Sequence, residues 1–244
     1  MQFDKISIII PTLNEEKLIN QILSQFDESV KKKFNLEIIV SDGGSKDNTI
    51  NLINGSVDKI IVHKEKFKQN ISRGRNQGAN NSLGDVLIFL NADTLISDIN
   101  KFFNSLNEIL SDKKIIAIAC PVKVFPDEEK LTDRIFHLFY NNYVRILNKF
   151  FMGMGRGECH IIRREDFFKM KGYRESYAAG EDFDLYRRLR KTGRISYLKE
   201  CLVYESPRRY RKFGYARVFL DWVLNSVSIT VFNKSISKEW QEVR

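Results

Sequence analysis

One carboxylate, Asp93, lies where the chain could bind a metal ion. It closely follows Val86 to Leu90, five apolar residues that are typical of a strand buried on both faces of a mostly parallel sheet. Open α/β sheets place their ligands at the carboxyl ends of such strands, so Asp93 could hold a divalent cation against a phosphate-bearing ligand. Asn91 and Asp93 could instead only end the strand and shape the following turn.

A second carboxylate, Asp182, lies in the first turn of a predicted helix. It is spaced i, i+3 and i+7 with Leu185 and Leu189, so it points inward if the leucines face the core, while Glu181 and Asp184 point elsewhere. An inward carboxylate beside a cleft could accept a proton from an attacking hydroxyl. The alternative is that Asp182 only pairs favourably with the helix dipole.

Polar residues also follow the first two predicted strands, which cover residues 6–10 and 36–40. Thr12 and Glu15 fit a capping box that opens a helix, which is one role for them. Asp42 falls beside Thr12 and could accept hydrogen bonds from a ribose or a base, although Asp before Gly-Gly is also common in turns.

Two basic segments could bind an anionic ligand. Arg75 and Arg73 lie one residue apart in a predicted helix, so at most one of them need face the cleft. A guanidinium offers a fixed fork of donors that suits a phosphate or a nucleobase edge. The run from Ser206 to Lys212 contains Arg208 and Arg209 and could bind a diphosphate or acidic lipid headgroups, or simply be solvated.

The elements that must position these side chains alternate between strand and helix at short intervals. This order predicts a parallel α/β sheet with right-handed crossovers, and four of its strands would bring polar groups to one edge. The predicted strands cover residues 6–10, 36–40, 59–63, 86–90 and 115–120, with a helix near 99–110. The alternation breaks after Pro121.

The last third contains two long apolar segments. We expect residues 131–151 to form a helix with one apolar face buried in the protein. That face is made of Ile135, Leu138, Phe139, Tyr143, Ile146, Leu147 and Phe150, and Phe136, Tyr140 and Val144 widen the apolar surface. The alternative is a membrane-interface helix with Arg134, Arg145 and Lys149 toward the headgroups. We expect residues 213–232 to form a packed or interfacial helix. Arg217 and Asp221 interrupt this apolar segment, which argues against a membrane-spanning helix.

Between these segments, Gly153, Gly155 and Gly157 predict either a loop that moves over or approaches a ligand, or a simple linker.

Composition indicates a soluble globular chain with an anionic partner. Of 244 residues, 43% are apolar and 29% charged, and the formal charge of +9 favours nucleotides, nucleic acid or an acidic membrane surface. The three scattered cysteines indicate neither a disulfide framework nor a paired-cysteine zinc site. Without a signal-peptide pattern or a long apolar run, we expect a cytoplasmic protein, peripheral at the inner face of the membrane.

Five motifs, taken in their order, resemble those of the family 2 glycosyltransferases, which have the nucleotide-sugar-binding fold called GT-A. The motifs are Ile8-Ile-Ile-Pro-Thr-Leu-Asn-Glu15, Ser41-Asp-Gly-Gly-Ser-Lys-Asp-Asn-Thr49, Arg75-Asn-Gln-Gly78, Phe89-Leu-Asn-Ala-Asp-Thr94 and Gly180-Glu-Asp182. The resemblance implies an α/β fold with a mostly parallel sheet. It also implies transfer of a sugar from a nucleotide-sugar donor to an acceptor hydroxyl with inversion.

The resemblance also assigns roles to individual residues. Those expected to bind the nucleotide part of the donor are Pro11, Thr12, Glu15, Asp42 and Arg75. Asp93 would bind Mn²⁺ or Mg²⁺ at the diphosphate, and Asp182 would be the catalytic base, ionised near neutral pH through its ordinary acidity.

One feature departs from the usual metal motif, which carries a further acidic residue near the position of Asp93. This chain has Asn91 before Asp93 and Thr94 after it. We therefore expect Asn91 to offer a neutral oxygen at the donor, and Arg208 and Arg209 to add positive charge at the diphosphate.

The predicted organisation has three parts. Residues 1–120 form the nucleotide-sugar-binding half, 121–205 the acceptor-side and catalytic half of the same domain, and 206–244 a basic, apolar helical extension. The acceptor would be a glycan or a lipid-linked molecule. A sugar nucleotidyltransferase is an alternative, but it needs a glycine- and lysine-rich triphosphate loop that residues 11–15 do not resemble. A non-catalytic module that binds a nucleotide or a sugar is a second alternative. Nucleic acid is not expected as a partner.

Overall fold

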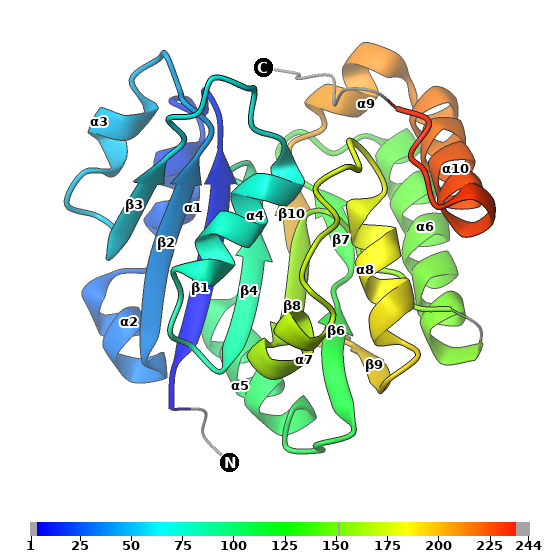
Figure 1. The fold of residues 1–244 in the computed structure, drawn as a ribbon, viewed down its shortest axis with the longest axis horizontal. Helices are drawn as coiled ribbons and strands as arrows, with labels where there is room; N and C mark the ends of the chain where they lie inside the picture. Colours follow the sequence, from blue (N-terminus) through cyan, green and yellow to red (C-terminus); the bar gives the residue numbers. More distant parts are fainter. Residues whose placement is uncertain (1–3, 151, 238–244) are drawn as a thin grey trace.

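The centre of the molecule is a seven-stranded sheet (Figure 1), seen in a computed structural model that describes residues 4–150 and 152–237. The strand order is β3-β2-β1-β4-β8-β6-β9. Strand β8 runs antiparallel to its neighbours β4 and β6, and the other pairs are parallel. The strands are β1 (Ile6–Thr12), β2 (Leu36–Asp42), β3 (Lys59–Val62), β4 (Val86–Leu90), β6 (Ile115–Ala119), β8 (Cys159–Arg163) and β9 (Arg194–Tyr197). The predicted mostly parallel α/β sheet is confirmed.

Helices cover both faces of this sheet, because successive side chains of each strand point to opposite sides. Ile8 and Ile10 of β1 enter one core, whereas Ile9 enters the other. The first core is closed by α1 (Ile19–Leu23), α2 (Glu28–Phe34), α3 (Thr49–Ile53) and α5 (Ile99–Ile109). The second contains residues of α4 (Ile71–Asn80), α6 (Leu131–Phe150), α7 (Arg164–Lys169), α8 (Glu181–Leu189) and α10 (Tyr215–Phe232).

A small second sheet supports the segment that carries Asp93. Its order is β5-β10-β7, formed by β5 (Thr94–Ile96), β10 (Val203–Glu205) and β7 (Val122–Val124). The backbone N–H of Ser206, just after β10, donates to the carbonyl of Asp93 at 3.3 Å. Asp93 is therefore held between two sheets. Sequence reasoning missed β5 and β7, since three residues are too few to show a strand pattern.

The predicted capping box at Thr12 and Glu15 was wrong. Thr12 belongs to β1, and the first helix starts only at Ile19, with no side-chain bond at its N-cap. The Thr12 hydroxyl instead donates to Asp42, and the backbone N–H of Glu15 donates to the hydroxyl of Thr49 at 2.8 Å. Both side chains are thus left at the edge of the sheet.

The glycine-rich segment before β8 is not a mobile loop at its first two glycines. A Cβ atom on Gly155 would lie 2.6 Å from the ring of Tyr186, and one on Gly153 would collide with the backbone of the same residue. These glycines let the chain pack directly against α8. This packing argues against a simple linker, and Gly157 of the same segment lines the cavity described below.

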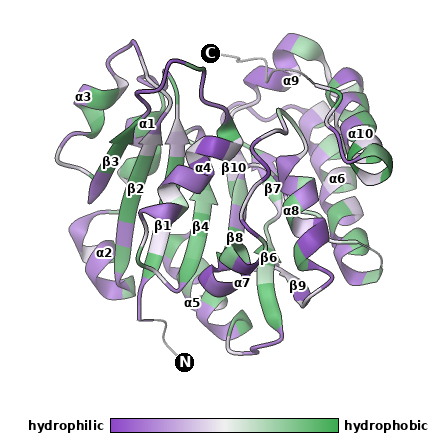
Figure 2. Ribbon diagram, viewed as in Figure 1, coloured by the Kyte–Doolittle hydropathy of each residue, from purple (hydrophilic) through white to green (hydrophobic). Residues whose placement is uncertain are grey.

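The predicted burial of the 131–151 helix was correct for Tyr140 and Val144 and wrong for most of the seven-residue face. Helix α6 does form, with residue 151 outside the described part of the chain, but five residues of that face are exposed and Tyr143 and Leu147 are only half-buried. Figure 2 shows hydrophobic segments on α6 and on the neighbouring α10 at one edge of the molecule. The residues that α6 buries are Asp133, His137, Tyr140, Val144 and Asn148.

The helix predicted over 213–232 is confirmed as α10, which covers Tyr215–Phe232. It is preceded by a separate short helix, α9 (Arg208–Phe213), which ends at Gly214, where φ is +79°. Within the described residues, the helices are too short or too polar to cross a bilayer.

Candidate active site

A cavity of about 480 Å³ opens where the polar ends of β1, β2 and β4 meet. Its walls include all the predicted site residues except Asp42. They are Pro11, Thr12, Glu15, Arg75, Asn91, Asp93 and Asp182. Parallel strands thus bring residues from distant motifs to one edge of the sheet, as the sequence predicts. The far side of the cavity is formed by residues of α6, α8, α9 and α10.

Asp42 is fully buried beside the cavity. One carboxylate oxygen accepts the backbone N–H groups of Gly44 and Ser45, both at 2.8 Å. The other accepts the hydroxyls of Thr12, at 3.2 Å, and of Ser45. The carboxylate therefore fixes the loop after β2, whose Gly43 lines the cavity. Direct contact of Asp42 with a nucleotide stays a prediction.

Glu15 and Asp93 converge on a single nitrogen of Arg208. Nη2 of Arg208 lies 2.9 Å from Oδ2 of Asp93 and 3.0 Å from each carboxylate oxygen of Glu15. Burial by itself would lower the pKa of Arg208, but the two carboxylates outweigh it and raise the pKa. Two acidic groups from the ends of β1 and β4 thus share one cationic partner brought by α9.

This donor set fits a divalent cation that is bound together with a diphosphate. No cluster of three or more His, Cys, Asp or Glu side chains able to hold a metal occurs in the part of the chain that the structure describes. Mg²⁺, however, is commonly bound by one or two carboxylates plus substrate phosphates. Glu15 and Asp93 supply two carboxylates already aimed at one positive centre. Asn91 is less suited, because its Oδ1 accepts from Nη2 of Arg75 at 3.1 Å.

Arg75 is fully buried and connects several elements of the site. Nη1 lies 2.8 Å from Oε1 of Glu181 at the start of α8, and Nη2 donates to the carbonyl of Gly157 at 2.6 Å. Burial would lower the pKa of Arg75, but Tyr173 and Glu181 outweigh it and raise the pKa. Arg75 therefore fixes the start of α8 relative to β4. Sequence reasoning missed Glu181 because its partner lies 106 positions away.

Asp182 follows Glu181 and faces the same cavity. One of its oxygens accepts the backbone N–H of Phe183 at 2.7 Å, and the other lies beside Gly157. Burial, followed by the negative charge of Glu181, raises the pKa of Asp182 to about 7. The expectation of ordinary acidity was therefore wrong. A carboxylate with a pKa near the working pH is well suited to act as a general base.

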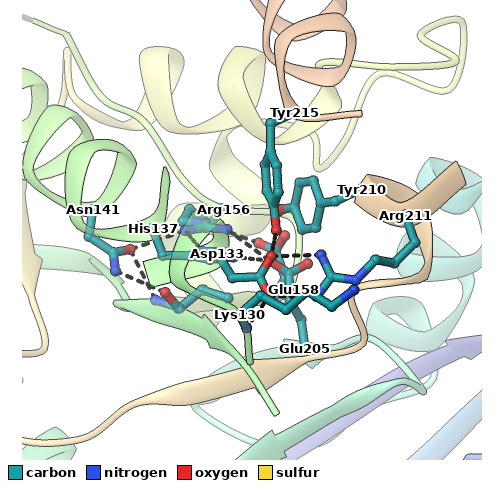
Figure 3. A network of polar contacts seen from close by, with 11 residues as sticks. Lys130, Asp133, His137, Asn141, Arg156, Glu158, Glu205, Tyr210, Arg211 and Tyr215 are labelled. Atoms are coloured by element: carbon teal, nitrogen blue, oxygen red, sulfur yellow. Dashed lines mark hydrogen bonds and ion pairs between the residues drawn. The ribbon is translucent and has the colours of Figure 1, made fainter. Parts of the chain in front are cut away.

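Sequence reasoning missed a second buried polar network (Figure 3). It includes Glu158, whose negative charge also acts on Asp182. Arg156 lies 3.3 Å from Glu158 and 3.1 Å from Glu205, and Tyr210 donates to Glu205 at 2.9 Å. Burial and the charge of Glu158 raise the pKa of Glu205 well above its usual range, and the two carboxyl groups are hydrogen bonded. Arg156 lies between the two carboxyl groups and supplies a positive charge to both.

The only sequence signal for this network was an arginine and a glutamate on either side of Gly157. That signal was hidden by the interpretation of the glycines as a flexible loop. All three charged members, Arg156, Glu158 and Glu205, line the cavity.

With this geometry in place, comparison with known proteins gives the family. The model of the family described as Glycosyl transferase family 2 matches residues 7–179. The chain belongs to this family. It is a family 2 glycosyltransferase, and the matched region contains every predicted site residue except Asp182.

Similar glycosyltransferases occur in bacteria and eukaryotes. An uncharacterized glycosyltransferase of Haemophilus influenzae is 35% identical over 120 residues, which are 48% of this chain and 46% of that protein. A human dolichyl-phosphate beta-glucosyltransferase is 27% identical over 146 residues, covering 53% of this chain and 44% of that protein. The matches thus span less than half the length of either relative.

Solved structures share the GT-A fold of this glycosyltransferase. The mannosyltransferase PcManGT from Pyrobaculum calidifontis, in complex with GDP-Man and Mn²⁺, has a TM-score of 0.65 and 18% identity, covering 90% of this chain and 64% of that one. Glucosyl-3-phosphoglycerate synthase from Mycobacterium tuberculosis, in complex with Mn²⁺ and UDP, has a TM-score of 0.62 and 15% identity, covering 96% and 81%.

Proposed function

We propose that this glycosyltransferase moves a sugar from a nucleotide-sugar donor to an acceptor hydroxyl with inversion at the anomeric carbon. The observation that carries the proposal is that one cavity is lined both by the Glu15–Arg208–Asp93 cluster and by Asp182. The first group suits a diphosphate and the second a hydroxyl that must lose a proton. The nucleotide-sugar GDP-Man bound by the similar PcManGT supports a donor of this class.

The donor diphosphate would lie against the end of β4. There Asp93 and Glu15 would hold Mn²⁺ or Mg²⁺, which when bound supplies positive charge to the leaving diphosphate. Arg208 would exchange its carboxylate partners for diphosphate oxygens, for which a guanidinium is geometrically suited. Arg209, the next residue of α9, also lines the cavity and would add a second positive charge. Pro11 and Thr12 would contact the nucleotide.

The chemical step would use Asp182 as the base. Its carboxylate takes the proton of the acceptor hydroxyl while that oxygen attacks the anomeric carbon. The bond between this carbon and the diphosphate oxygen breaks in the same step, and its electron pair leaves with the nucleoside diphosphate. Attack from the face opposite the leaving group inverts the anomeric configuration. Arg75 positions the base through Glu181, the residue before it.

The acceptor would be a lipid-linked molecule or a growing glycan, and the enzyme would work at the inner face of a membrane. Two observations support this part of the proposal. The human relative is named as acting on dolichyl phosphate, a lipid. The cavity also extends to α6 and α10, where Tyr140, Trp222 and Ser226 line it.

Replacing the proposed base tests this function. We expect Asp182→Asn to bind a nucleotide-sugar with an affinity within about threefold of wild type and to lose at least about a hundredfold in turnover, since general-base catalysis contributes about 10²–10⁴. Affinity is measured by calorimetry and turnover by release of the nucleoside diphosphate. Asp127→Asn is the matched control, because Asp127 is an exposed aspartate outside the cavity.

If Asp182→Asn bound donor normally and kept full turnover, the assignment of the base would be wrong. If wild-type protein bound donor but released no nucleoside diphosphate with any acceptor, a non-catalytic binding module would be favoured.

A further inference from the structure

Helix α6 buries a mixed stripe and turns an apolar face to the surface. The buried stripe contains Tyr140 and Val144, which join the core, and three polar residues, Asp133, His137 and Asn148, which are held by hydrogen bonds within the fold. Its outward face carries six of the fifteen large apolar side chains that are exposed among the described residues. They are Leu131, Ile135, Leu138, Phe139, Ile146 and Phe150. Leu138, for example, is 67% exposed. Surface helices normally bury their apolar stripe.

Helix α10 continues the same surface. Five more of the fifteen exposed apolar residues lie on it, namely Leu220, Leu224, Val227, Val231 and Phe232. The two helices are joined by ring contacts, with Phe139 of α6 lying 5.7 Å from Phe219 and Tyr140 lying 5.2 Å from Trp222. We call the eleven exposed residues the α6–α10 surface. Contiguous apolar patches of this kind mark protein or membrane contacts rather than ordinary surface.

The charges around this surface select a lipid bilayer with acidic headgroups as its occupant. Exposed basic residues flank the apolar side chains on both helices and just beyond them: Arg134, Arg145, Lys149, Arg217 and Lys234. Arg134 pairs with Glu129 at 2.6 Å, and the exposed acids Asp127 and Glu128 lie just before α6. Of the two acids on these helices, Asp133 is buried against Arg211, which leaves only Asp221 exposed. An apolar face bordered by Lys and Arg is typical of helices that lie in a membrane interface.

We propose that the α6–α10 surface docks on an anionic bilayer, with both helices lying in the interface. The proposal deepens the proposed function, and its consequence for the acceptor rests on that function. Tyr140, Trp222 and Ser226 on these two helices also line the cavity that contains Asp182. These three residues lie on the cavity side of the helices and the eleven exposed residues on other faces, so docking would place the helices that wall the acceptor side of the cavity at the membrane, close to a lipid-linked acceptor.

Flotation with lipid vesicles tests the apolar part of this docking. The wild-type chain is mixed with vesicles of phosphatidylcholine, or of phosphatidylcholine with an equal amount of phosphatidylglycerol, without donor or acceptor. We expect it to float with the mixed vesicles. In the double variant Leu138→Gln and Leu224→Gln, binding should fall by roughly tenfold for each leucine, since each loses apolar burial. The matched control is Leu83→Gln, because Leu83 is 69% exposed but lies between α4 and β4.

A second pair of variants tests the charge contribution. Arg145→Gln with Lys149→Gln removes two charges beside the α6–α10 surface, and binding to the mixed vesicles should fall by about fivefold for each charge. Lys32→Gln with Lys113→Gln removes the same charge from exposed positions near α2 and α5 and should leave binding unchanged. Binding of the wild type should also weaken as salt increases.

Three results would overturn the proposal. The first is wild-type protein that stays unbound with both kinds of vesicle. The second is equal loss of binding in Leu83→Gln and in the leucine double variant. The third is a dimer in buffer that the leucine double variant separates, which would assign the surface to a second copy of the chain. Donor binding, measured without vesicles, should stay the same in all the variants, so failure of docking and failure of the transferase are distinguished.

Discussion

At the scale of single residues, the catalytic assignment depends on how the fold changes the acidity of Asp182. Its predicted helix position could be derived from the spacing of Leu185 and Leu189. Its raised pKa could not, because that shift comes from burial and from the nearby charges of Glu181 and Glu158. These neighbours come together only in the folded chain.

The raised pKa of Asp182 predicts how activity depends on pH. A general base works only when deprotonated, so kcat/KM should fall below a pH of about 7, approaching a tenfold loss per pH unit. An aspartate of ordinary acidity would keep full activity down to a pH of about 4. The measurement is kcat/KM between pH 5 and 8 at saturating Mn²⁺. A profile that is flat down to pH 5 would contradict the assignment.

The ionisation of Asp182 that activity requires should also destabilise the fold. The folded state raises the pKa of Asp182, so ionised Asp182 destabilises the fold once the pH exceeds the pKa in the unfolded chain, and most strongly above about 7. Asp182→Asn should therefore raise the free energy of unfolding at pH 8 relative to wild type, while at pH 4 the difference should shrink. Urea unfolding at the two pH values measures this, with Asp127→Asn as the control. If the variant were less stable than wild type at pH 8, ionised Asp182 would not destabilise the fold.

Arg208 gives a prediction about the proposed metal. In Arg208→Ala, Glu15 and Asp93 lose their shared partner, so their repulsion should destabilise the fold and favour a cation in its place. We expect Mn²⁺ alone to raise the melting temperature of Arg208→Ala by more than that of wild type. Lys212→Ala is the control, because Lys212 is an exposed cation on the same helix. If Mn²⁺ shifted the melting temperature equally in all three proteins, Glu15 and Asp93 would not be the metal ligands.

At the scale of elements, the short helix α9 connects the donor side of the cavity to α6. Arg208 binds Glu15 and Asp93, Tyr210 donates to Glu205, and Arg211 binds Asp133 of α6. Three residues within one turn thus reach three separate parts of the molecule. The position of α9 is therefore determined by the α6 helix as well as by the cavity.

The bond between α9 and α6 should contribute to stability in a pH-dependent way. Burial would raise the pKa of Asp133, but hydrogen bonds from Arg211 and Tyr215 outweigh it and lower the pKa. This stabilisation is complete above the pKa of about 4 in the unfolded chain and is lost as the pH falls through the folded value. We expect Asp133→Asn to cost about 1–3 kcal/mol at pH 7.

Urea unfolding of Asp133→Asn measures this cost, with the exposed Asp127→Asn again as the control. The difference from wild type should shrink below pH 4. A variant as stable as wild type at pH 7 would show that the α9–α6 contact contributes nothing to the fold.

Elements differ in how far the sequence predicts them. Strands β1, β2 and β4 were predictable because both their faces are buried, which produces continuous apolar runs. The periodicity of α6 correctly grouped seven of its apolar residues on one face, but periodicity does not say whether that face points inward. The answer depends on partners such as Arg156 and Arg211, which satisfy the polar stripe from other elements.

At the scale of the whole molecule, the sheet edge and the helices α6, α8, α9 and α10 line two sides of one cavity. The motifs predicted the first side, because each of its residues directly follows a strand or opens a helix. The second side could not be predicted, since its contacts join residues far apart in the chain. Arg208 and Glu15, for example, are separated by 193 positions. The division into 1–120, 121–205 and 206–244 stays a prediction, and residues 1–3 and 238–244 lie outside the described part.

The central claim is that the cavity binds a nucleotide-sugar together with a divalent cation. Thermal unfolding of the wild-type chain with UDP-sugars and GDP-sugars, each with and without Mn²⁺, tests it most directly, because a ligand that binds only the folded state raises the melting temperature. We predict that one nucleotide class raises it by about 5–10 °C with Mn²⁺ at roughly 100 times Kd, and by clearly less without the metal. If no nucleotide-sugar changes the melting temperature, with or without Mn²⁺, the account of this cavity as a donor site is contradicted.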